Sequence, residues 1–485
     1  MFTYFKKLLS ETLIYGLSGV TSGLLTILFV PIYTRVFSPE DYGVMGLITT
    51  TMALLSIVIV LSLDNSAHRW YWDTEDINDR KTTLASWTWC QIVVSLFIAG
   101  LVFILAPWLG DVLIKRDDGV VYLRWAAMTL PLGVLNMVVA NWLRMQRRPW
   151  TTVAFTVGNG LFNFLLTIIL VVFFHQGLKG VYVAQVVTVA MGSIVAAALL
   201  RDWASLQRFQ WRRLLAMLKY GLPMIPAALA YWIVNLSGRY FVQGYSSIAE
   251  VGLYQVGSTI AAMVALVTGA FQLAWGPFAM SIHKQPEAKK VYANVLLIYL
   301  WTTCLISTVI SLFAPEILSF FTTESYHDAS GVVSLLSFNY VVVGLGYIAT
   351  IGPAIARTTK PYGVALVVAG GLTVMLNLIL VPCFGKEGSA SATLIAQSIV
   401  PVYVFYRSQK LYPIPFRFGA ALGIFLCAFL LASLGGRLLV TNHVLAIGIK
   451  VLIISIFFPS LFILRIVSFK QARTFLRYKY RGTKE

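Results

Sequence analysis

Apolar runs of about 20 residues recur along the whole chain, and they limit its fold more than any other feature. A helix needs about 20 apolar residues to cross a bilayer, whereas a membrane β-barrel shows alternating segments of about 10 residues, which this sequence lacks. The composition agrees, because only 12% of residues are charged and 58% are hydrophobic, against about a quarter charged in soluble domains. We therefore expect an all-α polytopic membrane protein.

The apolar runs predict about fourteen transmembrane helices. The expected spans are 12–34, 42–63, 83–106, 119–143, 151–174, 179–200, 214–237, 250–280, 290–313, 329–355, 361–382, 388–406, 417–436 and 443–464. The span at 250–280 is too long for one straight crossing, so we expect it to be tilted or kinked near Pro277. No cleavable signal peptide is expected, since the basic start MFTYFKKLLS leads into a run that is long enough to span.

Lysine and arginine predict the orientation of these spans. If the N-terminus is cytoplasmic, 27 of the 37 basic residues lie in inner segments and 7 in outer ones, which obeys the positive-inside rule. The net charge of +18 therefore follows from topology, and no nucleic-acid partner is expected. We expect a multi-pass protein of the bacterial cytoplasmic (inner) membrane, with both termini in the cytoplasm.

Two basic, aromatic segments, 201–215 and 465–485, are typical of helices that lie on an anionic bilayer surface. The four cysteines and five histidines are dispersed. We therefore expect no disulfide framework, no metal site and no cofactor.

The chain also repeats itself. Residues 119–150 match 331–362 without a gap, and shorter matches keep the same order. Two repeats of six spans each have the same orientation, an arrangement common in transporters whose substrate site lies between the halves. The expected domains are an N-terminal six-helix lobe (1–200), an amphipathic cytoplasmic linker (201–213), a C-terminal six-helix lobe (214–410), two additional helices (411–466) and a basic cytoplasmic tail (467–485).

The segment PIYTRVFSPEDYG (31–43) interrupts the first two apolar runs. Ser38 can cap a helix, Pro39 suits its first position, and the two acids that follow favour the positive end of its dipole. Arg35 has a counterpart, Arg239, at the matching point of the second repeat. Both side chains could snorkel to the headgroups. Alternatively, the pair faces a central cavity and binds an anionic group such as phosphate.

Other residues near or inside the spans are further candidates for substrate binding, because charge in lipid requires a partner or water. These are Asp64, Arg69, Arg124, Lys219, Tyr231 and Trp232. The two aromatic residues could stack on a sugar ring, although packing is their commoner use. Pro223 and Pro226 should bend the helix that carries them. Asp64 is the candidate for coupling to H⁺ or Na⁺.

The stretch YGLSGVTSGLLTILFVPIYTRVFSPEDYGVMGLITTTMALL resembles the start of bacterial polysaccharide flippases, the exporters of O-antigen and capsule. The resemblance extends to the RRPW and TTKPY loops and to NLILVPCFGKEGSASATLIAQ (377–397). These proteins belong to the multidrug/oligosaccharidyl-lipid/polysaccharide (MOP) exporter superfamily.

The resemblance implies two six-helix lobes around a V-shaped central cavity and alternating access. The implied substrate is an oligosaccharide on polyprenyl (undecaprenyl) pyrophosphate, moved from the cytoplasmic to the outer leaflet. The resemblance also implies that Arg35 and Arg239 lie in the outer half of the cavity, and Asp64, Arg69 and Lys219 in its inner half. Besides this lipid-linked oligosaccharide and the bilayer, other membrane proteins of glycan assembly are candidate partners.

Two other functions are alternatives to lipid-linked oligosaccharide transport. A multidrug antiporter of the same superfamily would need an embedded acid to bind a cation, yet the first span has no acid beyond Glu11 and the seventh has none. A membrane enzyme of glycan processing would need a larger loop than 64–82. The four acids in that loop are better explained as a charge-balanced, solvated segment. We therefore expect a transporter and not an enzyme.

Overall fold

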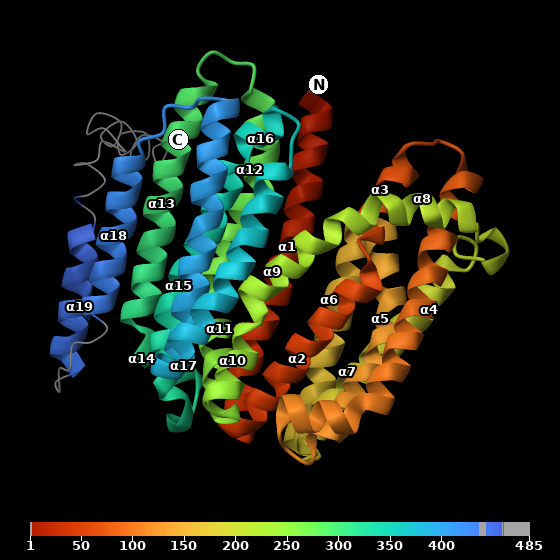
Figure 1. Ribbon diagram of the computed structural model, residues 1–485, viewed down its shortest axis with the longest axis horizontal. Helices are drawn as coiled ribbons and strands as arrows, with labels where there is room; N and C mark the ends of the chain where they lie inside the picture. The colour runs from red at the N-terminus through yellow and green to blue at the C-terminus, as the bar shows by residue number, and fades with distance from the viewer. Residues whose placement is uncertain (1, 436–442, 458, 460–485) are drawn as a thin grey trace, which may run out of the picture. The chain divides into compact units, whose positions relative to one another are not determined.

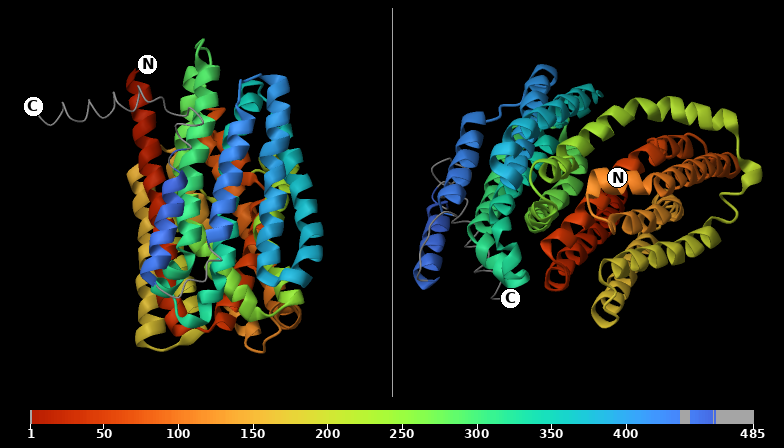
Figure 2. Two further views of the ribbon diagram at one scale, coloured as in Figure 1. Left: turned by 90° about the vertical axis from the view of Figure 1, so that its left-hand side faces the viewer. Right: turned by 60° about the horizontal axis from the view of Figure 1, so that its bottom comes forward.

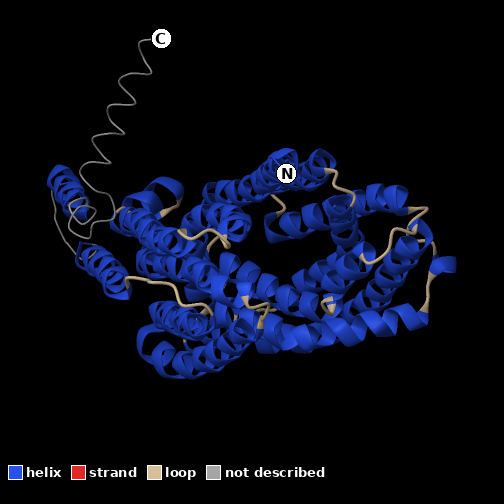
Figure 3. Cartoon of the chain, turned by 90° about the horizontal axis from the view of Figure 1, so that it is seen from above, coloured by secondary structure: helices blue, strands red, loops and turns tan. Residues whose placement is uncertain are grey.

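The structure is a computed structural model that describes residues 2–435, 443–457 and 459. Its regular elements are all helices, and no strand occurs among the described residues (Figure 3). Within the described ranges, twelve helical segments are long and apolar enough to cross a membrane. The expected all-α polytopic membrane protein is therefore confirmed.

Two places account for the difference between the fourteen expected spans and these twelve segments. Helix α17 (Lys360–Leu411) runs through two expected spans, 361–382 and 388–406, with a non-helical backbone at Gly385 between them. Helix α19 (His443–Phe457) covers the described part of the last expected span, and its apolar stretch is shorter than the others. The expected basic tail, 467–485, lies outside the described residues.

The expected long span at 250–280 is divided into α11 (Ile248–Ala261) and α12 (Met263–Ile282). The interruption lies at Ala262, whereas Pro277 stays inside α12. The tilt, or the kink near Pro277, that the sequence favours stays a prediction.

Residue contacts divide the chain into two compact units. The first unit comprises Met1–Thr259, Phe321–Tyr326 and Leu366–Ala396, and the second comprises the remaining residues. These bounds differ from the lobes expected at 1–200 and 214–410, since residues 201–259 belong to the first unit. The pseudo-symmetric six-helix lobes stay a prediction.

The first unit contains most of the helices (Figure 1). They are α1 (Phe2–Val36), α2 (Pro39–Val60), α3 (Leu63–Trp72), α4 (Ile77–Leu109), α5 (Gly119–Met145), α6 (Pro149–Ile168), α7 (Gly177–Leu200), α8 (Trp211–Gly221), α9 (Ile225–Leu236), α10 (Gly238–Tyr245), most of α11 and the middle of α17 (Leu366–Ala396). Short π-helical segments extend α4 over Gly110–Ile114 and α6 over Ile169–Phe173. Its core includes Trp87, Val138 and Met217, which are fully buried.

The second unit holds α12, α13 (Ala288–Leu312), α14 (Ala314–Phe321), α15 (Ser330–Ala349), α16 (Ile351–Ile355), the last part of α17, α18 (Phe418–Gly435) and α19. Helices α13, α15 and α18 lie side by side in it (Figure 2). The indole nitrogen of Trp275 on α12 donates to the carbonyl oxygen of Tyr347 on α15 at 3.1 Å.

Glycine allows α2 and α11 to approach each other closely. A Cβ atom at Gly43 would collide with the carbonyl oxygen of Ile248, and one at Gly252 would collide with that of Pro39. Close approach through small residues is the usual way for helices to associate in lipid, where hydrophobic transfer offers no driving force.

Proline divides the expected span at 214–237. Helix α8 ends at Gly221, a 3₁₀ turn covers Leu222–Met224 and contains Pro223, and α9 begins at Ile225 with Pro226 in its first turn. The expected bend is confirmed. Proline suits these positions because it lacks an N–H and tolerates the first turn of a helix.

Candidate functional site

The turn between α1 and α2 forms as its sequence predicts. The Ser38 hydroxyl accepts the amide hydrogen of Asp41 at 3.2 Å, and the Asp41 carboxylate accepts that of Ser38 at 3.3 Å. Asp41 also accepts a hydrogen bond from Arg116 at 2.7 Å, and Arg116 donates to Asp118 as well. Burial opposes the charge of Arg116, but these hydrogen bonds outweigh burial and raise its pKa.

Arg35, in the last turn of α1, is exposed. Its expected counterpart Arg239, on α10, is only 6% exposed. The Arg239 guanidinium donates to the side-chain oxygen of Gln255 at 2.7 Å and to the carbonyl oxygen of Asn235 at 3.4 Å. It also lies 5.5 Å from the ring centroid of Tyr254. The two arginines therefore occupy unlike environments within the first unit.

Three of the predicted residues gather on two helices in contact, α3 and α8 (Figure 1). The Arg69 guanidinium lies 4.7 Å from the ring centroid of Tyr220, which is the neighbour of exposed Lys219. Asp64, half-buried, lies in the first turn of α3. The helices are joined where the Ser66 hydroxyl donates to the carbonyl oxygen of Met217 at 2.8 Å.

Arg124 lies elsewhere, on α5. Its guanidinium is 5.0 Å from the ring centroid of Phe103 on α4, and its Nε atom is buried with no hydrogen-bond partner in the described part of the chain. The arginine is half-buried inside a candidate span. The positive charge is therefore kept at an aromatic face, where the ring quadrupole stabilises it.

The two neighbouring aromatic residues on α9 differ in exposure. The side chain of Tyr231 is 52% exposed, whereas that of Trp232 is 9% exposed. The Trp232 indole donates to the carbonyl oxygen of Thr50 at 3.1 Å. Trp232 is therefore packed inside the protein, which is the commoner use of such a residue. The exposed ring of Tyr231 is available for contact with a ligand.

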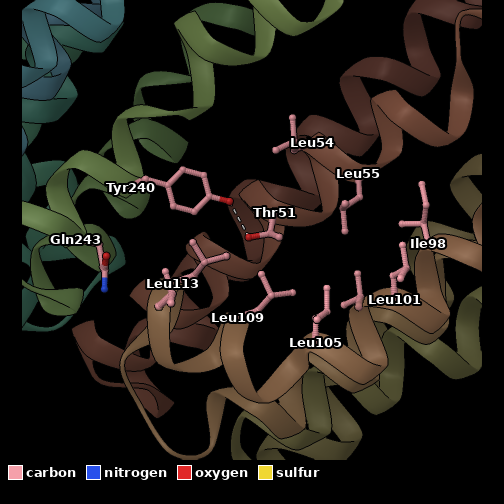
Figure 4. A pocket seen from close by; sticks show the side chains of 12 residues that line it. Thr51, Leu54, Leu55, Ile98, Leu101, Leu105, Leu109, Leu113, Tyr240 and Gln243 are labelled. Carbon is pink, nitrogen blue, oxygen red and sulfur yellow. Dashed lines mark hydrogen bonds between the residues drawn. The ribbon is translucent and has the colours of Figure 1, made fainter.

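Sequence reasoning missed a cavity of about 610 Å³ in the first unit (Figure 4). Its walls are leucine-rich and come from α2, α4 and α10. Three polar residues line it, Thr51, Tyr240 and Gln243. They are dispersed along the chain with no motif, so only the packing of three helices reveals them.

A buried ion pair was missed as well. The ammonium of Lys386 lies 3.1 Å from a carboxylate oxygen of Glu250, and only 5% of the lysine side chain is exposed. Both residues belong to the first unit. The polar, glycine-flanked segment GKEG (385–388) indicates an interruption between two apolar runs. It does not indicate that Glu250, at the start of α11, is the partner of Lys386.

Three of the four acids in the segment after α3 have protein partners. Asp73 lies 3.9 Å from Arg69, Asp79 pairs with Arg213, and Asp76 caps α4. Among the described residues, no group of three or more His, Cys, Asp or Glu side chains could hold a metal ion.

Comparison with solved structures shows which fold this arrangement has. One similar structure is the lipid II flippase MurJ in an inward closed conformation, with a TM-score of 0.71 and 14% identity over 92% of this chain and 98% of that chain. Another is an inward-facing multidrug resistance MATE family transporter of the MOP superfamily, with a TM-score of 0.66 and 16% identity over 86% of this chain and 98% of that chain.

Sequence comparison adds the family. The model of the family described as "Polysaccharide biosynthesis protein" matches residues 8–283. A relative, the succinoglycan biosynthesis transport protein ExoT of Rhizobium meliloti, is 21% identical over 262 residues, which are 53% of this chain and 49% of that protein. This chain therefore aligns with about half the length of ExoT. The fold of the chain is similar to those of the MurJ and MATE structures. By the family match over more than half of its length, the chain belongs to the polysaccharide biosynthesis protein family.

Proposed function

We propose that the protein is a flippase for lipid-linked oligosaccharide. It moves an oligosaccharide on polyprenyl (undecaprenyl) pyrophosphate from the cytoplasmic to the outer leaflet of the bacterial inner membrane by alternating access. The glycan serves O-antigen, capsule or exopolysaccharide synthesis. Membership of the family and the MurJ-like fold support a transporter of this class.

The sign of the charge on α8, α9 and α10 is the observation that carries the proposal. From Trp211 to Tyr245 the chain contains no Asp or Glu, yet it contains Arg212, Arg213, Lys219 and Arg239. The membrane part of α1 likewise has no acid and ends in Arg35. Positive charge near the membrane attracts a pyrophosphate and repels a cation. In this proposal Arg35 and Arg239 bind phosphate or acidic sugars, and Arg69 and Lys219 attract the headgroup from the inner side. Arg124 adds a further positive charge inside a span.

Leaflet location of the lipid-linked oligosaccharide tests the function. In a deletion strain, inverted and right-side-out vesicles should show the lipid accumulating on the cytoplasmic face, and the intact gene should reverse this. A normal leaflet distribution together with normal surface glycan would contradict flipping.

A cation antiporter is the second candidate, since the fold is also that of a MATE transporter. It would extrude a cationic dye from cells in a manner that depends on an embedded acid. Asp64 is the proposed coupling residue in either case, with H⁺ or Na⁺ as the ion. Replacing Asp64 by asparagine should abolish the dependence of transport on the ion gradient while leaving protein levels normal. A membrane enzyme of glycan processing is the least favoured function, because the candidate residues lie on spans and their ends.

A further inference from the structure

The cavity between α2, α4 and α10 has one polar end and one apolar end. Figure 4 shows Gln243 and Tyr240 at one end, and Ile98 and Leu55 at the other. The lining residues of α4 and its π-helical extension run from Ile98 to Leu113, about 22 Å along a helix. Leu101, Leu105 and Val112 are 41 to 46% exposed, so the cavity opens along this helix to the surroundings of the protein.

The polar end of the cavity contains a hydrogen-bond donor that could bind a ligand. The hydroxyls of Thr51 and Tyr240 are hydrogen-bonded to each other at 2.7 Å, so they satisfy one another. Gln243 is 7% exposed, and its Nε2 atom has no hydrogen-bond partner among the described residues. A buried amide donor without an acceptor is energetically unfavourable, because it has lost its hydrogen bond to water. A ligand that carries an acceptor at this end of the cavity would remove that cost.

The direction of the cavity matches a lipid of one leaflet. Gln243 lies two residues before the end of α10, and Leu113 lies at the end of the π-helical segment that follows α4. In the topology that the basic residues predict, both ends are on the outer side of the membrane. The polar end then faces the outer headgroups, and the apolar end reaches toward the bilayer midplane.

We propose that this cavity holds the part of the isoprenoid chain next to the phosphate of the carrier lipid after translocation, with Gln243 donating to an oxygen of the phosphate group. The inference rests on the proposed function. It adds a binding site for the lipid part of the translocated product. A single chain is favoured, because a volume of about 610 Å³ is that of a pocket for one small molecule, within the usual range of about 300–1,000 Å³. The leucine-rich wall has no polar group for a sugar, so the glycan stays outside.

Photo-crosslinking of the purified full chain in nanodiscs tests this directly. The probe is a polyprenyl phosphate with a diazirine in the isoprene units next to the phosphate. We expect crosslinks at the end of α4 and on its π-helical extension, where Leu109 and Leu113 line the polar end of the cavity. Excess unlabelled polyprenyl phosphate should compete, and phosphatidylglycerol should not. Crosslinks that phosphatidylglycerol abolishes equally would show an ordinary bilayer lipid and overturn the proposal.

Two substitutions and a matched control sharpen the test. Leu105→Trp fills the cavity from its open side and should reduce crosslinking at least tenfold. Leu96 is on the same helix and is 55% exposed, but it does not line the cavity. Leu96→Trp should therefore leave crosslinking unchanged. Gln243→Leu should weaken competition by polyprenyl phosphate about tenfold but leave competition by the matching polyprene hydrocarbon, which has no acceptor oxygen, unchanged. Equal effects of Leu105→Trp and Leu96→Trp would overturn the proposal.

The leaflet assay separates this inference from the proposed function. If the parent protein flips lipid-linked oligosaccharide but the probe labels no cavity residue, the cavity proposal fails and the flippase proposal stands. If the parent protein does not flip this lipid, the proposed function fails, and the cavity proposal fails with it whether or not the probe is captured.

Discussion

The ammonium of Lys386 lies 3.1 Å from the carboxylate of Glu250, directly after Gly385, where the backbone of α17 departs from helical geometry. Loss of one partner of a buried pair leaves an uncompensated charge, which costs about 3–5 kcal/mol when both are fully buried. Glu250 is 30% exposed, so we expect Lys386→Met to lower the free energy of unfolding by less, about 2 kcal/mol. Thermal unfolding in detergent measures this.

The exposed lysine at the start of α7 supplies the control for that prediction. Lys179→Met should change stability by less than about 0.5 kcal/mol. The double variant Lys386→Met with Glu250→Leu should recover most of the loss, since an apolar pair often replaces a buried ion pair without cost. A double variant less stable than Lys386→Met alone would contradict this account.

Gly385 adopts φ 53° and ψ −130°, a conformation that side chains with a Cβ rarely adopt. A Cβ atom there would have ordinary neighbours, at 3.5 Å from Ser246 and 3.6 Å from Glu250, so space is not limiting. We expect Gly385→Ala to cost about 1–3 kcal/mol through backbone strain alone. Gly371→Ala, on the same helix with nothing within 4 Å, should instead be neutral or stabilising by up to about 1 kcal/mol. Equal melting temperatures for the two variants would refute the strain argument.

Sequence periodicity predicted the membrane helices because length and hydrophobicity are local properties. The SPED turn was predictable for the same reason, since Ser38 and Asp41 cap a helix within four residues. The kink at Gly385 was visible only as a gap between two apolar runs, and helical structure resumes directly after it in α17. The break at Ala262 had no signal at all, because neither proline nor glycine occupies that position.

The candidate site was less predictable, because its contacts join residues far apart in the chain. Arg239 could be recognised as a charge near a span, but its acceptor Gln255 is an ordinary polar residue on another helix. Likewise, nothing near Gln243 in the sequence indicates that α2 and α4 form a cavity beside it. The sequence predicts the charge and hydrogen-bonding capacity of each residue, whereas the burial and the partners of that residue depend on how the helices pack.

Tyr231 and Trp232 should respond differently to substitution. Trp232→Phe removes the hydrogen bond to the Thr50 carbonyl oxygen and should lower stability by about 0.6–1.7 kcal/mol, the range for hydrogen bonds between membrane helices. Tyr231→Ala alters an exposed ring and should lower transport of lipid-linked oligosaccharide without lowering the melting temperature, if the ring stacks on sugar. Unchanged transport in Tyr231→Ala at a normal protein level would exclude that contact.

Arg35 and Arg239 separate a binding role from a structural one. Arg35→Ala removes an exposed charge, so stability should change by less than about 0.5 kcal/mol. Arg239→Ala removes the donor that faces Gln255 and should lower the free energy of unfolding by about 1–3 kcal/mol.

If Arg35 binds the pyrophosphate, Arg35→Ala should lower the flipping rate about tenfold or more, because a hydrogen bond to a charged group contributes about 1.5–3 kcal/mol. Lys179→Ala, another exposed base on the predicted outer side, is the matched control and should flip normally. The leaflet assay in vesicles gives the rates, and normal flipping by Arg35→Ala would show that this side chain only reaches toward the headgroups. Arg35→Lys then distinguishes charge from geometry, since a lysine cannot reproduce the bidentate contact of a guanidinium with phosphate.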